Sequence, residues 1–379
     1  MILHRAVLHG KLPPMSRSLA LTVILIILLS ACQPAATPSL PTPSLPVATA
    51  TLPPSATLTP PTPTLVPPTP TPSPIPNSQY TLKARFNLNR HTVAVEQSIL
   101  YIYPYDDPVS ELVLQVEANN QSGVFRLNQL SINTQTIANS KLVGNHLDIP
   151  LAVPLNRGQN LRIDLSYDLA LPVIPPPSND SRSVIFGYSA RQTNLIDWYP
   201  YVPPRRDGKW LVHNPWFYGE HQVYGIADYQ VEIELLEPPA NLVMAACAPA
   251  QQSGSRYIYQ HKNARNFTLS ASTMYTVVTQ KVGEVTVTSY AFPFDAGGGK
   301  QALKDAVDAL ALYSKLFGPY PRTTLAVVEA DFHDGMEYDG LYFLSRAFYS
   351  LYDGTPKGYL TAIGVHETAH QWWYALVGN

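Results

Sequence analysis

His366-Glu367-Thr368-Ala369-His370 is the stretch that decides how this sequence folds and what chemistry it can do. Two histidines four positions apart on a helix lie on one face, about one turn from each other, so both imidazoles can reach a single metal ion. Glu367 follows the first histidine, and a carboxylate there can take a proton from a metal-activated water. A zinc site built from protein normally needs a third protein ligand, which this stretch does not contain.

Helical periodicity surrounds the two histidines. Their stripe consists of Ile363, His366, His370, Trp373 and Val377. It predicts a helix from about Gly358 to Val377 whose histidines have apolar neighbours, as expected of a buried metal site. The alternative is a helix with two partly exposed histidines and a solvated glutamate, and the apolar neighbours favour zinc over it.

Residues 282–379 carry both helical and strand patterns. The apolar positions from Leu303 to Phe317 recur at intervals of three and four, which predicts an amphipathic helix that Gly318-Pro319 ends. Thr324 to Glu329 follows as a short strand. We therefore expect a mixed α and β domain around the metal helix.

Residues 78–281 are typical of strands. Tyr80–Leu88, Leu161–Tyr167 and Tyr229–Leu235 alternate apolar and polar side chains, and turn clusters separate them. No convincing helical period occurs before residue 300. The pattern predicts one all-β N-terminal domain, a sandwich, that ends near Lys281.

Residues 1–32 have the features of a bacterial lipoprotein signal peptide. An apolar run of about eleven residues, Leu19 to Leu29, follows several basic residues and is too short to span a membrane. Leu29-Ser30-Ala31-Cys32 resembles a lipoprotein cleavage box, so we expect cleavage before Cys32 and attachment of lipid to it. The alternative is an ordinary secretory signal with an incidental cysteine.

Residues 33–77 are rich in Pro, Thr and Ser and contain no charged residue. Such a stretch should be extended and solvated, and about 45 residues in the polyproline form could span roughly 140 Å. We expect a linker that holds an extracytoplasmic domain away from its lipid anchor in the cell envelope. The formal net charge of −2 provides no basic surface for nucleic acid.

Several motifs resemble one family. Val365–Trp373 is similar to the zinc helix of the aminopeptidase N (membrane alanyl aminopeptidase) family of gluzincin zinc metallopeptidases. Asp334–Tyr338 resembles that family's Gly-x-Met-Glu-Asn strand, and Phe317–Pro321 resembles the turn before the strand. Further likeness lies in Trp198-Tyr199-Pro200, Lys209-Trp210 and Tyr229–Leu235. The resemblance covers about residues 80 to 379.

The resemblance implies a fold: the all-β domain is followed by the first part of a thermolysin-like α+β metallopeptidase domain. It also implies that His366 and His370 are ligands of one Zn²⁺ ion and that Glu367 is the general base. Glu337 would bind the free α-amino group of a peptide, and Met336 and Gly335 on the same strand would also be substrate-binding residues.

Gly335, on that strand, would leave room for substrate backbone to approach. A carboxylate fixed near the scissile carbonyl both holds a cationic amino terminus and sets the register at one residue.

The sequence departs from the family at three places. Tyr338 replaces the usual asparagine, and Asp334 replaces the first glycine. The family's third zinc ligand is a glutamate about nineteen residues after the second histidine, which falls beyond Asn379, as does the tyrosine that stabilises the oxyanion. We therefore expect the N-terminal fragment of a longer enzyme.

The favoured function is a zinc-dependent aminopeptidase, lipid-anchored through Cys32, that hydrolyses N-terminal residues from peptides. One alternative is a catalytically dead tethered binding module or gene fragment. Another is a thermolysin-like endopeptidase, which shares the zinc helix but has no use for Glu337.

Overall fold

The computed structural model describes residues 75–176, 184–214 and 222–378, and residues 71–379 form one compact unit. The predicted signal peptide, Cys32 and nearly all of the predicted linker lie outside the described residues, so these remain predictions. No helix in the described part is both long and apolar enough to cross a membrane.

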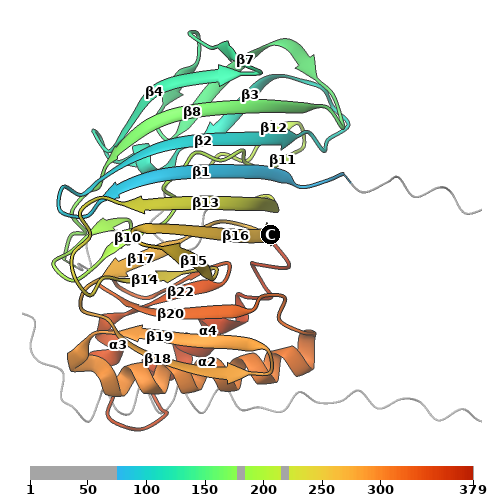
Figure 1. Ribbon diagram of the computed structural model, residues 1–379. Helices are drawn as coiled ribbons and strands as arrows, with labels where there is room; N and C mark the ends of the chain where they lie inside the picture. Colours follow the sequence, from blue (N-terminus) through green and yellow to red (C-terminus); the bar gives the residue numbers. More distant parts are fainter. Residues whose placement is uncertain (1–74, 177–183, 215–221, 379) are drawn as a thin grey trace, which may run out of the picture. The chain divides into compact units, whose positions relative to one another are not determined.

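The largest element is an eight-stranded sheet (Figure 1). In spatial order its strands are β15 (Ala250–Ser253), β16 (Arg256–Ala264), β13 (Ala227–Leu235), β1 (Ser78–Asn87), β2 (Thr92–Ile102), β8 (Asn160–Ala170), β4 (Phe125–Ile132) and β5 (Gln135–Thr136). The three strands that alternation predicts are confirmed as β1, β8 and β13. Only the β1–β13 pair is parallel among the pairs of this sheet.

Smaller sheets complete the first part of the chain. A three-stranded sheet consists of β3 (Val109–Gln115), β7 (His146–Leu155) and β6 (Lys141–Val143), and the 3₁₀ turn η1 (Glu117–Asn120) follows β3. A four-stranded sheet consists of β14 (Val243–Ala246), β17 (Leu269–Ser272), β10 (Thr193–Leu195) and β9 (Gly187–Tyr188), and β11 (Arg205–Arg206) pairs with β12 (Lys209–Trp210). The eight-, three- and four-stranded sheets share one hydrophobic core. It includes Leu82 of β1, Leu112 of β3 and Leu195 of β10. The predicted predominance of strands is confirmed.

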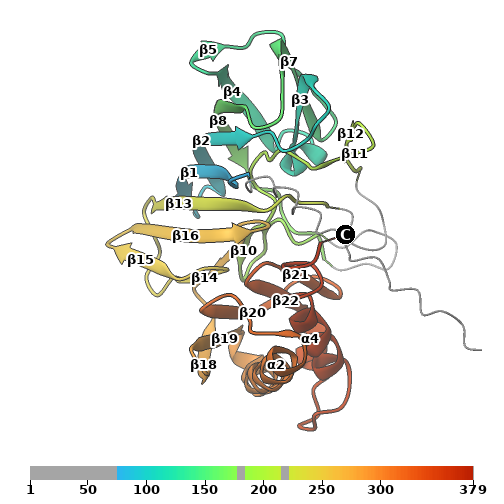
Figure 2. The ribbon, with the colours of Figure 1, turned by 90° about the vertical axis from the view of Figure 1, so that its right-hand side faces the viewer.

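The last part of the chain forms a five-stranded sheet with helices on one face (Figure 2). Its order is β18 (Thr276–Val282), β19 (Val285–Ala291), β20 (Thr324–Ala330), β22 (Leu341–Ser345) and β21 (Gly335–Tyr338). The helical segments are η2 (Pro293–Asp295), α2 (Ala296–Phe317), α3 (Arg346–Ser350) and α4 (Tyr359–Ala369).

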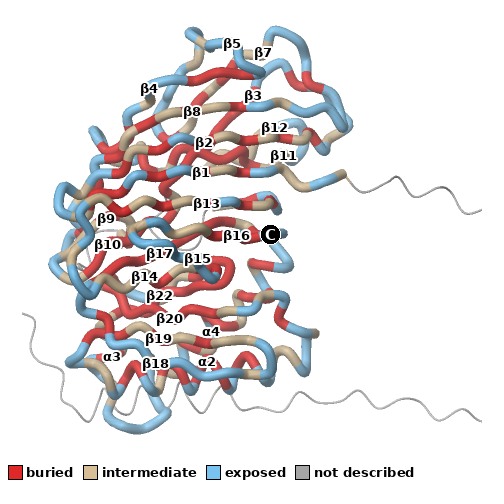
Figure 3. Tube along the Cα trace, in the orientation of Figure 1, coloured by how far each residue is buried: buried red, intermediate tan, exposed pale blue. Residues whose placement is uncertain are grey.

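Strand β20 separates two hydrophobic cores because successive side chains point to opposite faces. Val327 packs with Leu303 and Leu310 of α2, whereas Ala326 and Val328 belong to the core of the larger β-sheets. Figure 3 shows that β20 and β22 are buried along almost their whole length. The sheet that carries the candidate site is therefore covered on both faces.

The predicted boundary at Lys281 falls inside a hairpin. Strand β18 pairs with β19 from Thr276 to Val282, so it belongs to the five-stranded sheet. The change of sheet therefore lies before Thr276. The sequence pattern missed this because a strand alternates in the same way whichever sheet it joins.

The predicted helix from Gly358 to Val377 is too long. Helix α4 ends at Ala369, and His370 to Leu376 form turns. The N–H of Gln371 donates to the carbonyl of Thr368 (3.2 Å), and that of Trp372 to Ala369 (2.9 Å), which tightens the chain after the helix. In contrast, α2 ends at Phe317 before Gly318, as predicted.

A buried ion pair joins the two parts of the fold. Asp339, in the turn between β21 and β22, is fully buried and accepts hydrogen bonds from Arg322 Nε (2.9 Å) and Nη2 (2.8 Å). It also accepts from the backbone N–H of Arg265 (3.0 Å), next to β16, and its carboxylate lies 3.6 Å from His261 Nε2. Burial alone would raise the pKa of Asp339, but His261 and Arg322 outweigh it and hold the pKa at about 2.

Removing the negative charge of Asp339 should destabilise the fold. We expect Asp339→Asn to lower the free energy of unfolding by roughly 3–5 kcal/mol at pH 7, because it leaves Arg322 buried without its counter-ion. Asp106→Asn removes an exposed partner of Arg157 and should cost less than about 1 kcal/mol. Urea unfolding of both variants tests this.

The contribution of Asp339 to folding stability should decrease as the pH falls. Because the folded pKa of Asp339 is depressed, its contribution is present above the ordinary aspartate pKa and is lost as pH falls towards about 2. The difference between the wild-type chain and Asp339→Asn should therefore shrink over that acidic window. A difference that stays constant down to pH 2 would contradict this account of the turn.

Candidate metal centre

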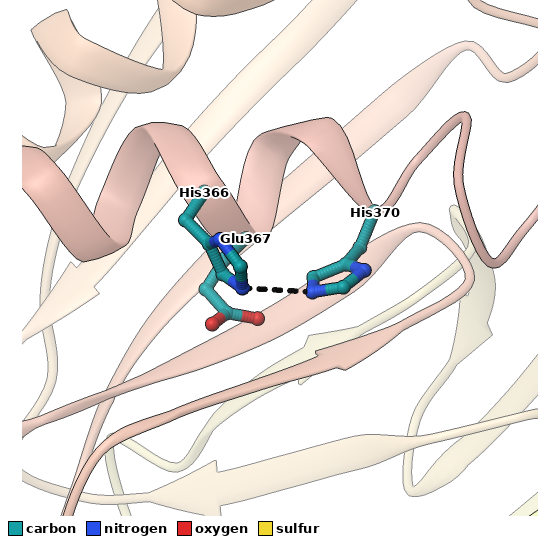
Figure 4. Close-up of side chains that lie close together, drawn as sticks. All are labelled: His366, Glu367 and His370. Atoms are coloured by element: carbon teal, nitrogen blue, oxygen red, sulfur yellow. Dashed lines mark hydrogen bonds between the residues drawn. The ribbon is translucent and has the colours of Figure 1, made fainter. Parts of the chain in front are cut away.

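Helix α4 brings the two predicted zinc ligands and the predicted base together (Figure 4). The Nε2 atoms of His366 and His370 lie 3.1 Å apart, and their ring planes are nearly perpendicular at 87°. The possible ligand atoms of these histidines and of Glu367 all lie within 4.8 Å of one another. Within the described residues, this is the one group of three or more His, Cys, Asp or Glu side chains close enough to hold a metal ion.

The spacing of the imidazole nitrogens suits zinc. Two nitrogens each ~2.0 Å from a tetrahedral zinc ion are ~3.3 Å apart, close to the separation seen here. His370 Nδ1 lies 3.0 Å from the carbonyl oxygen of Trp373, which can only accept, so Nδ1 carries the proton and Nε2 presents a lone pair. The two imidazole nitrogens therefore suit a divalent ion such as zinc, which binds histidine nitrogen in tetrahedral geometry.

The histidine face is more exposed than predicted. His366 is exposed and His370 half-buried, while Trp373 is 48% and Val377 67% exposed, so the prediction of a buried histidine stripe is wrong. The buried face of α4 consists of Leu360, Gly364, Glu367 and Thr368. Sequence periodicity missed this face because small and polar side chains make up most of it.

Strand β21 touches helix α4 at Gly335. A Cβ atom on Gly335 would lie 2.7 Å from Ile363 Cγ2 and still closer to the carboxylate of Glu367. Real Cβ atoms are not found at such distances, so the close approach needs glycine. The sequence led us to expect that Gly335 makes room for substrate backbone; in the structure it makes room for the candidate base.

Glu337 lies on the same face of β21 as Gly335, because residues two apart on a strand share a face. Its antiparallel partner is Tyr342, whose hydroxyl lies 3.1 Å from Thr368 Oγ1 on α4. Glu337 therefore faces the metal helix, and its side chain is buried.

Met336 and Tyr338 take the opposite face of β21 and pack with the core of the larger sheets. The structure thus brings Gly335 and Glu337 to the candidate site but turns Met336 away from it.

Tyr374 lies near enough to Glu337 to be affected by its charge, and it was not predicted. Burial raises the pKa of the Tyr374 phenol, and the negative charge of Glu337 is the next largest cause of the rise. The phenol accepts a hydrogen bond from Asn266 Nδ2, and its ring meets Tyr224 edge to face, with centroids 6.3 Å apart. No sequence pattern marks a tyrosine after the predicted zinc helix as a neighbour of Asn266 and Tyr224.

Gln371 is a second residue that sequence analysis did not find. It is fully buried; its Nε2 donates to the carbonyl of Tyr338 (3.0 Å), and its Oε1 accepts from the N–H of Gly340 (2.9 Å). These bonds tie the residue after His370 to both sides of the β21–β22 turn. The distance between the metal helix and the strand that carries Glu337 is thereby fixed.

Solved structures share this fold. The chain is similar to a two-domain M1 zinc metallopeptidase mutant bound to L-arginine, with a TM-score of 0.51 and 15% identity, covering 79% of this chain and 65% of that one. It is also similar to the M1 zinc metallopeptidase from Deinococcus radiodurans, with a TM-score of 0.50, 15% identity and the same coverage of each chain.

The chain thus spans 65% of the length of these structures, and a likeness at this identity shows a shared fold. No protein-family model matches the sequence, and no curated protein matches it.

The contact between Gly335 and Glu367 can be tested by a double-mutant cycle. We expect Gly335→Ala to cost about 1–3 kcal/mol of folding stability, because the added methyl group displaces the carboxylate. The cost should fall in a Glu367→Ala background, where the carboxylate is absent. Gly297→Ala, at a helix position with no atom within 4 Å of the new Cβ, is the control and should be neutral or slightly stabilising. An equal cost of Gly335→Ala in both backgrounds would show that the two residues do not meet.

Proposed function

We propose that the protein is a zinc-dependent aminopeptidase that removes N-terminal residues from peptides. The observation that carries the proposal is the meeting of two elements: α4 brings His366, Glu367 and His370 together, and β21 presents Glu337 on the face towards them. The shared fold supports it, because the similar structures are described as zinc metallopeptidases.

His366 and His370 would hold the metal. When bound, zinc would supply Lewis-acid chemistry that polarises a carbonyl and makes water a nucleophile near neutral pH. Apart from Glu367, which we assign as the base, no other His, Cys, Asp or Glu side chain lies with the two histidines in the described part of the chain. We propose that it is a carboxylate from polypeptide outside the described residues, since two imidazoles alone would hold zinc weakly.

Glu367 would act as general base and then as general acid. Its carboxylate is buried between α4 and Gly335, so its position is fixed within reach of both histidine nitrogens. From there it would take a proton from the attacking water and pass it to the leaving amine.

Glu337 would bind the α-ammonium group of the substrate. A buried carboxylate has little water to compete with an ammonium ion, so a charge-assisted hydrogen bond there is strong. Because Glu337 is held on the strand that faces the metal helix, it would place the first peptide bond, and no later one, beside the metal.

The remaining parts of the proposal concern the whole protein. We propose that the five-stranded sheet and its helices are the first part of a thermolysin-like α+β domain that follows the β-sheets. We also propose that lipid on Cys32 anchors the protein outside the cytoplasm in the cell envelope, with residues 33–77 as the linker.

One rival is a tethered binding module without catalytic activity. The exposure of His366 favours this rival. A thermolysin-like endopeptidase is the other rival, and it would not depend on Glu337.

Hydrolysis of one peptide in two forms, with a free and with an acetylated amino terminus, separates these functions. In the zinc-loaded protein purified from its own cells, we expect cleavage of the free form only. Glu337→Gln should lower kcat/KM for the free form by ~10- to 100-fold, the loss of one hydrogen bond to a charged group worth ~1.5–3 kcal/mol. Glu367→Gln should lower kcat at least ~100-fold while the metal stays bound.

Glu284→Gln is the matched control, because it changes an exposed carboxylate in the β18–β19 turn and should leave both rates unchanged. Equal cleavage of the free and acetylated peptides would support an endopeptidase. Bound zinc without any cleavage would support the binding module.

A further inference from the structure

Two buried carboxylates that the proposed function does not use lie at one edge of the five-stranded sheet. Strands β19, β20 and β22 run parallel, so their carboxyl ends meet at this edge. Glu329, near the end of β20, is fully buried, and the side chain of Asp295, directly before α2, is only 9% exposed. The carboxyl group of Glu329 lies within hydrogen-bonding reach of Asp295. The end of β20 and the start of α2 therefore meet through two acidic side chains.

The charges around this pair do not balance while both carboxylates are ionised. Among the described residues, Arg346 at the start of α3 is the one basic side chain in ion-pair contact with them. Its Nε lies 3.4 Å from Asp295 Oδ2 and 4.0 Å from Glu329 Oε1. Neither of these oxygens accepts a hydrogen bond from a described residue. Because an uncompensated charge is costly in a buried site, the pair lacks one positive charge.

The other ionisable groups near Glu329 do not supply that charge. Asp331, two residues along the chain, forms its own ion pair with Arg191. Tyr275 and Tyr349 are near enough to feel the charge of Glu329, and burial raises the pKa of both phenols, so they stay neutral. A proton on Glu329 would balance the pair without any further group.

Burial is the largest cause that favours a proton on Glu329. Burial and the neighbouring Asp295 raise the pKa of Glu329 to about 9, although the N–H of Phe292 and the charge of Arg346 oppose the rise. Near neutral pH the protonated Glu329 can therefore donate a hydrogen bond to Asp295, which stays ionised beside Arg346.

The start of α2 depends on support from outside the helix. Its first turn contains Gly297–Gly299, and glycine disfavours a helix more than any residue except proline. Close packing requires the last of them, since a Cβ atom on Gly299 would lie 2.6 Å from Ala291 Cβ. The side chain of Asp295 makes no capping hydrogen bond to the helix. The contact between Asp295 and the end of β20 is thus well placed to hold this turn.

We propose that one proton shared by Glu329 and Asp295 fastens the start of α2 to the sheet and forms a latch that opens as the pH rises. In the closed latch Glu329 Oε2 accepts from the N–H of Phe292 (2.7 Å), and the protonated oxygen donates to Asp295. When the proton leaves to solvent, two like charges face each other at hydrogen-bonding range. They repel, and the first turn of α2 loosens.

Helix α2 supports the helix that carries the proposed metal ligands. Thr361 Oγ1 on α4 donates to Asp305 Oδ2 on α2 (2.8 Å). The hydroxyl of Tyr313 on α2 donates to the carbonyl of Val365 (3.3 Å), which directly precedes His366. The latch would therefore make the support of the candidate metal centre depend on pH, whether or not that centre is catalytic.

Urea unfolding of the full chain at several pH values tests the latch. Glu329→Gln keeps the shape and a donor of protonated glutamate but cannot ionise. Above the ordinary glutamate pKa of 4.5 the unfolded chain loses a proton that folded Glu329 keeps, so the wild type should lose stability relative to the variant as the pH rises towards about 9. Between about pH 6 and pH 8, the unfolding equilibrium constant of the wild type should rise about tenfold per pH unit relative to that of Glu329→Gln.

Two further variants locate the effect. Asp295→Asn removes the charge that repels ionised Glu329 while Arg346 stays, so the tenfold trend should end at a lower pH than in the wild type. Asp308→Asn is the matched control, because it changes an exposed carboxylate on the same helix. Its unfolding equilibrium constant should keep a constant ratio to that of the wild type over this range.

Two spectroscopic measurements observe the proton and the helix separately. A protonated carboxyl group has an infrared C=O band that an ionised one lacks, and the wild type at neutral pH should show such a band that Glu329→Gln does not. At about pH 10, amide hydrogen exchange of Ala296–Gly299 should be faster in the wild type than in Glu329→Gln at the same pH. Near neutral pH the two exchange rates should be equal.

Four results would overturn the proposal. A constant ratio of unfolding constants between the wild type and Glu329→Gln, or the absence of an infrared difference, would mean that Glu329 is ionised in the folded chain. Equal amide exchange in the alkaline range would mean that the proton does not hold α2. Stabilisation of the wild type but not of Glu329→Gln by Ca²⁺ would mean that a metal ion, and not a proton, balances the pair.

Discussion

The turn between β21 and β22 is held from two sides, and the candidate site depends on this constraint. On one side Asp339 is bound by Arg322 and by the backbone beside β16. On the other side Gln371, two residues past the end of α4, bonds to the backbone of Tyr338 and Gly340. A short strand at the edge of a sheet would otherwise be free to shift, so these bonds keep β21 against α4.

The pairing register of β21 with β22 determines which of its side chains face the candidate site. With the turn fixed, Gly335 and Glu337 face the helix, while Met336 and Tyr338 face the core of the larger sheets. A slip of one residue would exchange the two sets and bury Glu337 among apolar side chains. The close fit of Gly335 against Glu367 makes such a slip sterically costly, so the same contact positions Glu367, the proposed base, and Glu337, the proposed amine-binding carboxylate.

The features that sequence could predict are local ones. The meeting of His366, Glu367 and His370 follows from helical spacing, and β1, β8 and β13 follow from alternation. What sequence could not predict depends on contacts between distant residues. The buried face with Glu367 and Thr368 and the roles of Gln371 and Asp339 depend on partners between 17 and 78 positions away. The boundary placed at Lys281 failed for the same reason, since pairing with β19 assigns β18 to its sheet.

The central claim is that His366 and His370 bind one divalent ion together. Titration of the metal-free protein with Co²⁺, followed by its visible absorption, measures this directly. The account predicts about one ion per chain, displaced by Zn²⁺, with binding lost in both His366→Ala and His370→Ala. Absence of binding, or binding that survives either substitution with unchanged affinity, would contradict it.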